Sequence, residues 1–175
     1  DGALICQGND RMRPSNRNVL AATVLTSASF GLCLGEADAQ TGLRAPVTVT
    51  AQRNLDFSDV FPGVNKSIVV TDATSGKWLV TGDPGVVVDL TFPSLPATLA
   101  NGGSTIPIVY AATDAAYHTS DDAGAATSFD PSVGASPTLS MTGELYVWIG
   151  GTVQPSEVAS AGSYTGTITL DAAYP

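Results

Sequence analysis

Charged residues are scarce in this chain. Asp, Glu, Lys and Arg together make up 13% of its 175 residues, against about 25% in an average soluble domain. The seven Lys and Arg residues form no basic cluster after residue 17, and the net charge is −9. Because proteins bind nucleic acid through clustered Lys and Arg, we expect no nucleic-acid partner.

Histidine and cysteine are nearly missing as well. The single histidine, His118, stands in a polar stretch that is typical of an exposed loop. Both cysteines, Cys6 and Cys33, lie in the first forty residues, so no disulfide framework is expected beyond them. Three aspartates, Asp114, Asp121 and Asp122, lack the spacing of an EF-hand calcium loop, and we interpret them as solvated loop residues.

Motifs that carry enzyme chemistry are also lacking. The sequence contains no Gly-x-Ser-x-Gly elbow, no phosphate-binding loop and no dinucleotide fingerprint. We therefore expect no enzymatic activity, no cofactor and no metal site.

The first forty residues show the pattern of a secretory signal peptide. Arg13 and Arg17 precede an uncharged apolar run over residues 19–34, and Ala37-x-Ala39 supplies the small residues of a cleavage site. The run is shorter than the about 20 residues that a membrane span needs, although a retained anchor helix and a buried helix are the alternatives. We predict upstream residues at 1–11, a signal peptide at 12–39 and a secreted, extracellular protein at the cell surface.

The rest of the chain favours β-structure. Short alternating or β-branched stretches recur between turns rich in Gly, Pro and Asp, and no three turns of helical periodicity occur after residue 40. Strands are expected at 45–51, 67–71, 78–80, 86–92, 106–111, 139–141 and 145–153. Residues 113–137 are expected to form an irregular surface excursion. Regular short strands of this kind predict an all-β sandwich over residues 53–175.

Two segments near the ends of this region raise the question of strand pairing. Residues 162–175 alternate as one strand, with Gly162, Tyr164, Ile168, Leu170 and Tyr174 on one parity and threonines on the other. Such a strand must pair or leave an open edge. Residues 40–52 are either an N-terminal arm or the first strand, and Leu43, Ala45, Val47 and Val49 share one parity there.

Several motifs make the chain similar to the secreted bacterial family called the DUF4402 domain. The matching residues are Val47-Thr48-Val49-Thr50, Leu55-Asp56-Phe57, Pro62-Gly63, Gly82-Asp83-Pro84-Gly85, Thr91-Phe92-Pro93, Gly143-Glu144-Leu145-Tyr146-Val147, Ile149-Gly150-Gly151-Thr152-Val153 and Ala161-Gly162-Ser163-Tyr164-Thr165-Gly166-Thr167. Ser58 stands where the family usually has glycine. The resemblance implies an immunoglobulin-like β-sandwich on or outside the cell envelope, with no assigned catalytic activity.

The end of the chain also resembles chaperone–usher pilins, which close on an alternating strand with a penultimate aromatic and a glycine fourteen residues from the end. Tyr174 and Gly162 occupy those places. The resemblance implies a sandwich completed by a donor strand from a neighbouring subunit, with a periplasmic chaperone and an outer-membrane usher as partners. The disulfide of many pilins is missing here.

We therefore expect a structural subunit of an extracellular pilus-like filament or surface polymer, in which copies of the chain assemble by β-strand complementation. In that case residues 41–50 would lie in a groove of the adjacent subunit, with Leu43, Val47 and Val49 in its pockets. The alternative is a monomeric cell-envelope or adhesin module that binds glycan or protein, with Trp78, Tyr146 and Trp148 as a sugar platform. On alternating strands these aromatics more often pack within the protein.

Overall fold

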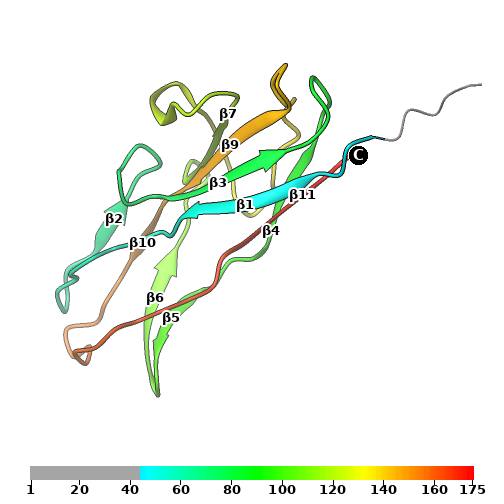
Figure 1. Ribbon diagram of the computed structural model, residues 1–175. Coiled ribbons are helices and arrows are strands. Elements are labelled where there is room, and N and C mark those ends of the chain that lie inside the picture. The colour runs from blue at the N-terminus through cyan, green and yellow to red at the C-terminus, as the bar shows by residue number, and fades with distance from the viewer. Residues whose placement is uncertain (1–43) are drawn as a thin grey trace, which may run out of the picture. The chain divides into compact units, whose positions relative to one another are not determined.

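Antiparallel β-strands build the described part of the chain, residues 44–175 of a computed structural model (Figure 1). The predicted signal peptide and both cysteines lie outside the described residues. The elements are β1 (Thr48–Arg53), β2 (Lys66–Ile68), β3 (Gly76–Thr81), β4 (Asp89–Ser94), β5 (Thr98–Asn101), β6 (Ser104–Val109), β7 (Ala115–His118), the 3-10 turn η1 (Ala123–Ala125), β8 (Thr127–Phe129), β9 (Glu144–Ile149), β10 (Gly151–Val153) and β11 (Thr169–Ala173). The all-β class is confirmed for these residues, and none of their helical turns is long and apolar enough to cross a membrane.

The strands form a two-layered, sandwich-like arrangement. One layer is a five-stranded sheet in the order β1-β3-β9-β7-β8. The strands facing it form a four-stranded sheet, β2-β10-β6-β5, and the separate pair β11-β4 (Figure 1). Every pairing between these strands is antiparallel.

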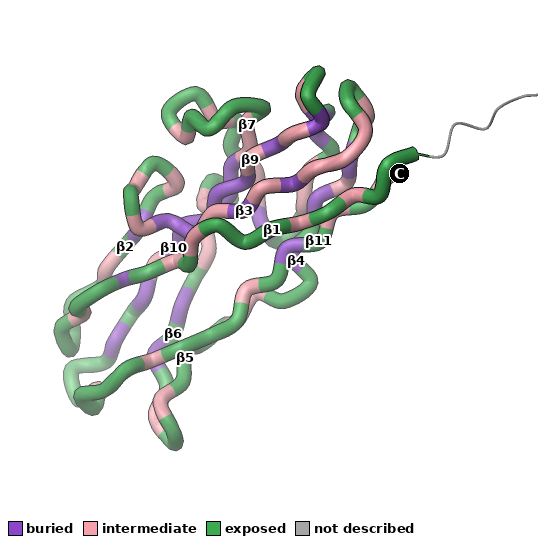
Figure 2. Tube along the Cα trace, in the orientation of Figure 1, coloured by how far each residue is buried: buried purple, intermediate pink, exposed green. Residues whose placement is uncertain are grey.

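The main hydrophobic core lies between the five-stranded sheet and the β11-β4 pair. The inward positions of β9 alternate as the sequence predicts, and Leu145, Val147 and Ile149 are fully buried. They pack with Leu90 and Phe92 of β4. Figure 2 shows buried stretches, in purple, on β9 and on neighbouring strands. Burial of these aliphatic side chains supplies the main stabilising force of the domain, since each removes a large apolar area from water.

A second, smaller core lies on the inner face of the four-stranded sheet. It consists of Phe57, Ile68, Ile106, Ile108 and Val153, all of them buried. No strand of the five-stranded sheet contributes to this cluster. Its cover is instead provided by two irregular segments, residues 54–60 and 159–168, which include the half-buried Leu55, Val60 and Tyr164.

The predicted surface excursion at 113–137 contains two strands and part of the core, so that prediction is corrected. β7 pairs with β9 in the middle of the five-stranded sheet, where Ala116 lies opposite Trp148. Ala115 and Ala116 are both fully buried. Alanine has little β-propensity of its own, and the strand exists because small side chains fit beside a buried tryptophan at this position.

The predicted strand 145–153 is divided at Gly150. β9 belongs to the five-stranded sheet and β10 to the four-stranded sheet. A Cβ atom on Gly150 would collide with the carbonyl oxygen of Ile68, and Gly150 N–H donates to the Asp114 carbonyl at 2.7 Å. Glycine is needed here because the backbone of another strand approaches where a side chain would stand.

The C-terminal strand is shorter than predicted. Regular pairing with β4 covers only β11, and the stretch before it has a single bridge, between Thr165 and Ala100. The two faces nevertheless follow the predicted alternation, with Leu170 buried, Ile168 half-buried and the threonines exposed. Gly166, in this sparsely paired stretch, lies against Leu99 and Pro96, and an added Cβ there would stand 2.8 Å from Leu99 Cδ2.

Replacing Ser58 by glycine should stabilise the protein. Ser58 has a φ of +50°, the only positive φ recorded for a non-glycine residue among those described, and glycine adopts such a φ without strain. Relief of left-handed strain, less the entropy cost of glycine, should raise the free energy of unfolding by about 0.5–1 kcal/mol. Thermal denaturation measures the gain. Ser163→Gly, at another exposed serine with no positive φ, is the control and should give none.

Candidate functional site

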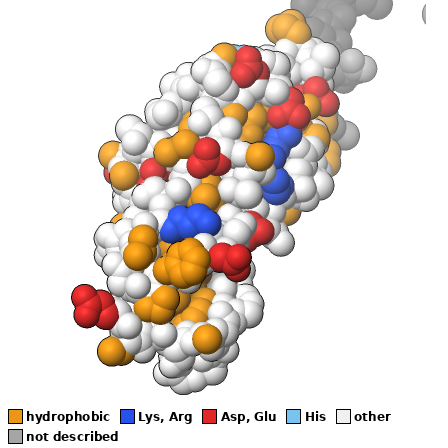
Figure 3. Space-filling model, turned by 90° about the vertical axis from the view of Figure 1, so that its left-hand side faces the viewer, with side chains coloured by type: hydrophobic (Ala, Val, Ile, Leu, Met, Phe, Trp, Pro, Cys, Tyr) orange, Lys and Arg blue, Asp and Glu red, His pale blue; other side chains and the backbone are white. Residues whose placement is uncertain are grey.

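An open groove of about 880 Å³ lies over the second core. Its floor contains Ile106, Ile108 and Val153, and Trp78 of the five-stranded sheet closes one side. Residues 53–60 form one wall and residues 159–168 form the other. Figure 3 views the molecule from the left-hand side of Figure 1, the side of β2. A group of hydrophobic side chains lies in the lower half of this view, and others are scattered above it.

The groove exists because only single segments cross the second core. β1 ends at Arg53, and the chain then leaves the five-stranded sheet toward β2. On the opposite side, residues 161–168 approach β11 without regular pairing (Figure 1). The inner face of β6, which carries Ile106 and Ile108, therefore borders the groove.

Small residues and sparsely paired backbone characterise the second wall. Residues 159–163 read Ala-Ser-Ala-Gly-Ser, so little side-chain bulk stands between the backbone and the groove. Within residues 161–167, the hydrogen bonds recorded for backbone atoms in the described part of the chain are the two between Thr165 and Ala100 and one from Ser94 Oγ to the Thr167 carbonyl oxygen at 3.4 Å. An apolar floor beside sparsely paired backbone is a combination that suits the addition of a β-strand.

The N-terminal segment requires a correction of the predicted arm. β1 pairs with β3 of the same chain, from Thr48 opposite Thr81 to Arg53 opposite Lys77. Val47 and Val49 pack against the main core of their own domain and are therefore not free to enter a neighbour's pockets in this structure. Of the two alternatives for residues 40–52, the first-strand interpretation holds from Thr48 on. Ala45 is exposed, and Leu43 lies outside the described residues.

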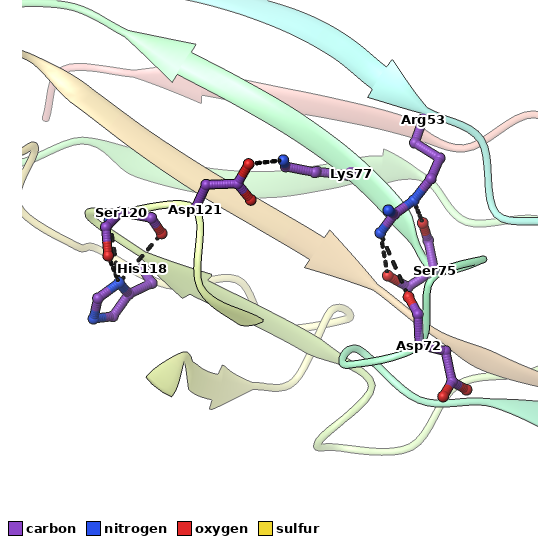
Figure 4. Close-up of polar contacts among 7 residues, drawn as sticks. All are labelled: Arg53, Asp72, Ser75, Lys77, His118, Ser120 and Asp121. Carbon is purple, nitrogen blue, oxygen red and sulfur yellow. Dashed lines mark hydrogen bonds and ion pairs between the residues drawn. The ribbon is translucent and has the colours of Figure 1, made fainter. Parts of the chain in front are cut away.

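Arg53 anchors the end of β1 beside the groove. Its Nε donates to the Ser75 carbonyl oxygen at 2.7 Å and its Nη2 to Ser75 Oγ at 2.9 Å (Figure 4). Ser75 is fully buried, and its hydroxyl donates in turn to the Val70 carbonyl at 3.0 Å. These bonds hold β1 in register where the chain turns away toward the groove wall.

Tyr174 binds the residues that precede the N-terminal end of β1. Its hydroxyl donates to the Ala45 carbonyl oxygen at 2.8 Å and accepts from the Asp83 N–H at 2.7 Å. Asp83 Oδ1 accepts from Ala45 N–H at 2.8 Å, and the Arg44 guanidinium lies 5.2 Å from the centre of the Tyr174 ring. We call this group of Arg44, Ala45, Asp83 and Tyr174 the clasp. Gly82 leaves room for it, because a Cβ there would stand 2.7 Å from the tyrosine oxygen.

Tyr174→Phe should loosen the clasp without removing the ring. Ala45 would lose a donor and Asp83 N–H an acceptor, which should cost about 0.5–1.5 kcal/mol of unfolding free energy. Amide hydrogen exchange in residues 45–50 should accelerate. Tyr164→Phe is the matched control, because that hydroxyl bonds only the local Ser160 carbonyl, and it should leave exchange in β1 unchanged.

Several charged residues and His118 form contacts within the domain, and His118 is the half-buried last residue of β7 rather than part of an exposed loop as predicted. Lys77 forms an ion pair with Asp121 at 2.6 Å, and His118 Nδ1 bonds Ser120 (Figure 4). Asp114 accepts from Ala111 N–H, and Asp122 caps η1 through Gly124 N–H. No cluster of three or more His, Cys, Asp or Glu suited to a metal ion occurs within residues 44–175.

The aromatic residues proposed as a sugar platform are packed. Trp78 is 9% exposed and meets Phe92 edge-on, with ring centres 5.9 Å apart. Trp148 is 2% exposed and stacks on Tyr146, whose ring lies 5.1 Å from the Lys77 Nζ atom. Both tryptophans therefore pack within the protein, which is the second of the two interpretations given for them in the sequence analysis.

Tyr110 carries a buried hydroxyl between the two cores. No hydrogen-bond partner contacts this oxygen among the described residues. Burial, and to a lesser extent the negative charge of Asp114, raise the pKa of Tyr110 to about 12. Both effects favour the protonated form of the hydroxyl.

The structure thus defines an all-β, sandwich-like module with an open groove whose floor is apolar. The family described as "Domain of unknown function (DUF4402)" matches residues 47–174, and the chain belongs to this family. The matched range begins just before β1 and ends at the clasp residue Tyr174, so it includes the sheets, the groove and both cores. No curated protein matches the chain.

Proposed function

We propose that this protein is a structural subunit of an extracellular pilus-like filament or surface polymer, joined to copies of itself by β-strand addition. The sandwich is taken to be immunoglobulin-like and to lack one strand. The groove over the second core carries the proposal, since it combines a floor of Ile106, Ile108 and Val153 with a wall of sparsely paired backbone. An incoming strand would gain main-chain hydrogen bonds along the wall and place alternate side chains on the floor.

The donor is proposed to be the segment ahead of β1 in a neighbouring copy. β1 belongs to its own sheet, and the clasp holds Arg44 and Ala45 on their own domain, so the available part of the predicted arm is residues 40–43, which include Leu43. Four residues of extended chain span about 13 Å, the length of a short strand. The clasp fixes where this segment leaves the domain.

Secretion and assembly partners follow from the same proposal. An exposed apolar groove is an aggregation hazard in a free subunit. A periplasmic chaperone would cover it before assembly, and an outer-membrane usher would direct the exchange for a neighbour's segment. Neither a cofactor nor a catalytic role is part of this function.

A photo-reactive residue at Ala161 tests the proposal directly. Ala161 is exposed, lines the groove wall and presents little bulk of its own. Isotopically labelled and unlabelled full-length copies are mixed, and cross-linked peptides are identified by mass spectrometry. We expect links between Ala161 of one copy and residues 40–43 of another. The same probe at Val133, which is 78% exposed and does not line the groove, is the control.

A second variant, Ala161→Trp, should fill the groove and abolish assembly while preserving the fold. Negative-stain microscopy reports assembly, and circular dichroism reports the fold. Fibres from Ala161→Trp would reject strand addition in the groove as the mode of assembly. Cross-links confined to single copies would reject it as well and favour a monomeric surface module.

A further inference from the structure

Two neighbouring β-turns expose large apolar side chains at one end of the domain. Phe61 is 69% exposed and Val64 57% in the first turn, and Val158 is 89% exposed in the second. The turns are joined by the Gly63 N–H, which lies 3.2 Å from the carbonyl oxygens of both Pro155 and Ser156. Turns usually carry Gly, Pro, Asn, Asp and Ser, so a cluster of this composition indicates a contact surface.

Hydrogen bonds within the turns fix the backbone that carries these side chains. Val64 N–H donates to the Phe61 carbonyl at 3.1 Å, and Ala159 N–H donates to the Ser156 carbonyl at 3.1 Å. Pro62 and Gly63 occupy the central places of the first turn, where the Gly63 φ of +70° suits glycine. The apolar surface formed by Phe61, Val64 and Val158, here called the turn patch, is therefore preorganised.

The turn patch is continuous with the groove. Val60 and Pro62 from the first turn region, and Pro155 and Ala159 from the second, line the groove itself. A strand that occupies the groove consequently brings the rest of its own subunit close to the turn patch.

The opposite end of the domain carries the segment that would supply this strand. Residues 44–46, the turn Gly82–Gly85 and the end of β11 lie together there, away from the turn patch (Figure 1). Met141, 85% exposed, stands beside this turn, with its Sδ 3.8 Å from a Cβ position on Gly85. One end thus presents Phe61, Val64 and Val158, and the other presents Met141 next to Pro84.

We propose that the turn patch binds the Met141 end of a second copy of this chain, in a head-to-tail contact that adjoins the occupied groove. This inference rests on the proposed strand addition and adds to it the surface that fixes the orientation of successive subunits. Because the two contacting surfaces differ, the interface is heterologous and extends into an open polymer unless its rotation closes a ring.

The test uses full-length protein with one end altered at a time. Phe61→Ser combined with Val158→Ser removes the turn patch, and Met141→Ser removes its partner. Either variant should raise the concentration needed for assembly by about tenfold, as loss of central apolar contacts does. Val133→Ser, at an exposed valine on neither surface, should assemble as the wild type does.

Mixing the two variants gives the sharper result. Each mixed pair retains one intact turn patch and one intact Met141 end, so analytical ultracentrifugation should detect dimers at concentrations where either variant alone is monomeric. Unchanged assembly of the separate variants, or a mixture that stays monomeric, would overturn the head-to-tail contact. If Ala161→Trp still blocks assembly in that case, strand addition stands and only this inference fails.

Discussion

Replacing Gly143 by alanine is expected to destabilise the protein by about 2–5 kcal/mol. Gly143 has a φ of +78°, which an L side chain adopts at a cost of about 1–2 kcal/mol. An added Cβ would also collide with the carbonyl oxygen of Gly82, and this atom cannot move freely because Gly82 N–H bonds the Gly143 carbonyl at 2.9 Å. Chemical denaturation followed by circular dichroism measures the loss.

Gly102→Ala is the matched control for this close packing. Gly102 has a similar φ of +58°, but no atom lies within 4 Å of the position that its Cβ would take. It should therefore show the backbone penalty alone, about 1–2 kcal/mol. Equal losses in the two variants would mean that the Gly82 carbonyl relaxes away from Gly143 without appreciable cost.

Leu170→Ala is expected to cost about 2–5 kcal/mol, because it opens a cavity in the main core. Leu170 is 4% exposed and packs in the cluster with Leu90 and Phe92. Ile168, two residues earlier on the same face, is half-buried and lines the groove. Ile168→Ala should therefore cost roughly half as much, since less apolar area is removed from water in the folded state.

The exposed Thr169 lies between Ile168 and Leu170, and its alanine variant is the control for these two stability measurements. Thr169→Ala should leave the midpoint of urea denaturation nearly unchanged. If Ile168→Ala proved as costly as Leu170→Ala, something would have to cover Ile168, and the groove would not be open beside it in the folded protein.

The strands with alternating aliphatic residues could be predicted from the sequence. The period of two in Leu145, Val147 and Ile149, and in Val88, Leu90 and Phe92, correctly indicates their buried faces. β7 could not be recognised in this way, because Ala115 and Ala116 owe their burial to partners distant in the chain. The division at Gly150 likewise depends on the approach of Ile68, which no local pattern contains.

The groove was beyond sequence analysis for a related reason. Leu55 and Phe57 indicate a half-buried stretch, and residues 159–163 read as an ordinary small-residue loop. Neither segment reveals that the two stand on opposite sides of one apolar floor. Val47 and Val49 illustrate a different limit of sequence analysis. Their alternation is easily recognised, but it fits an arm and a first strand equally well. Only the pairing of β1 with β3 separates these alternatives.

The strand that passes from β9 through Gly150 to β10 has a mechanical consequence. One continuous stretch of backbone, residues 144–153, contributes a strand to each layer and so joins the two sheets covalently. Sliding one layer over the other would break ladder bonds to β3 and β7 on one side of Gly150 and to β2 and β6 on the other. Resistance to shear therefore comes from hydrogen-bond ladders and peptide bonds together, in addition to the dispersion forces between side chains.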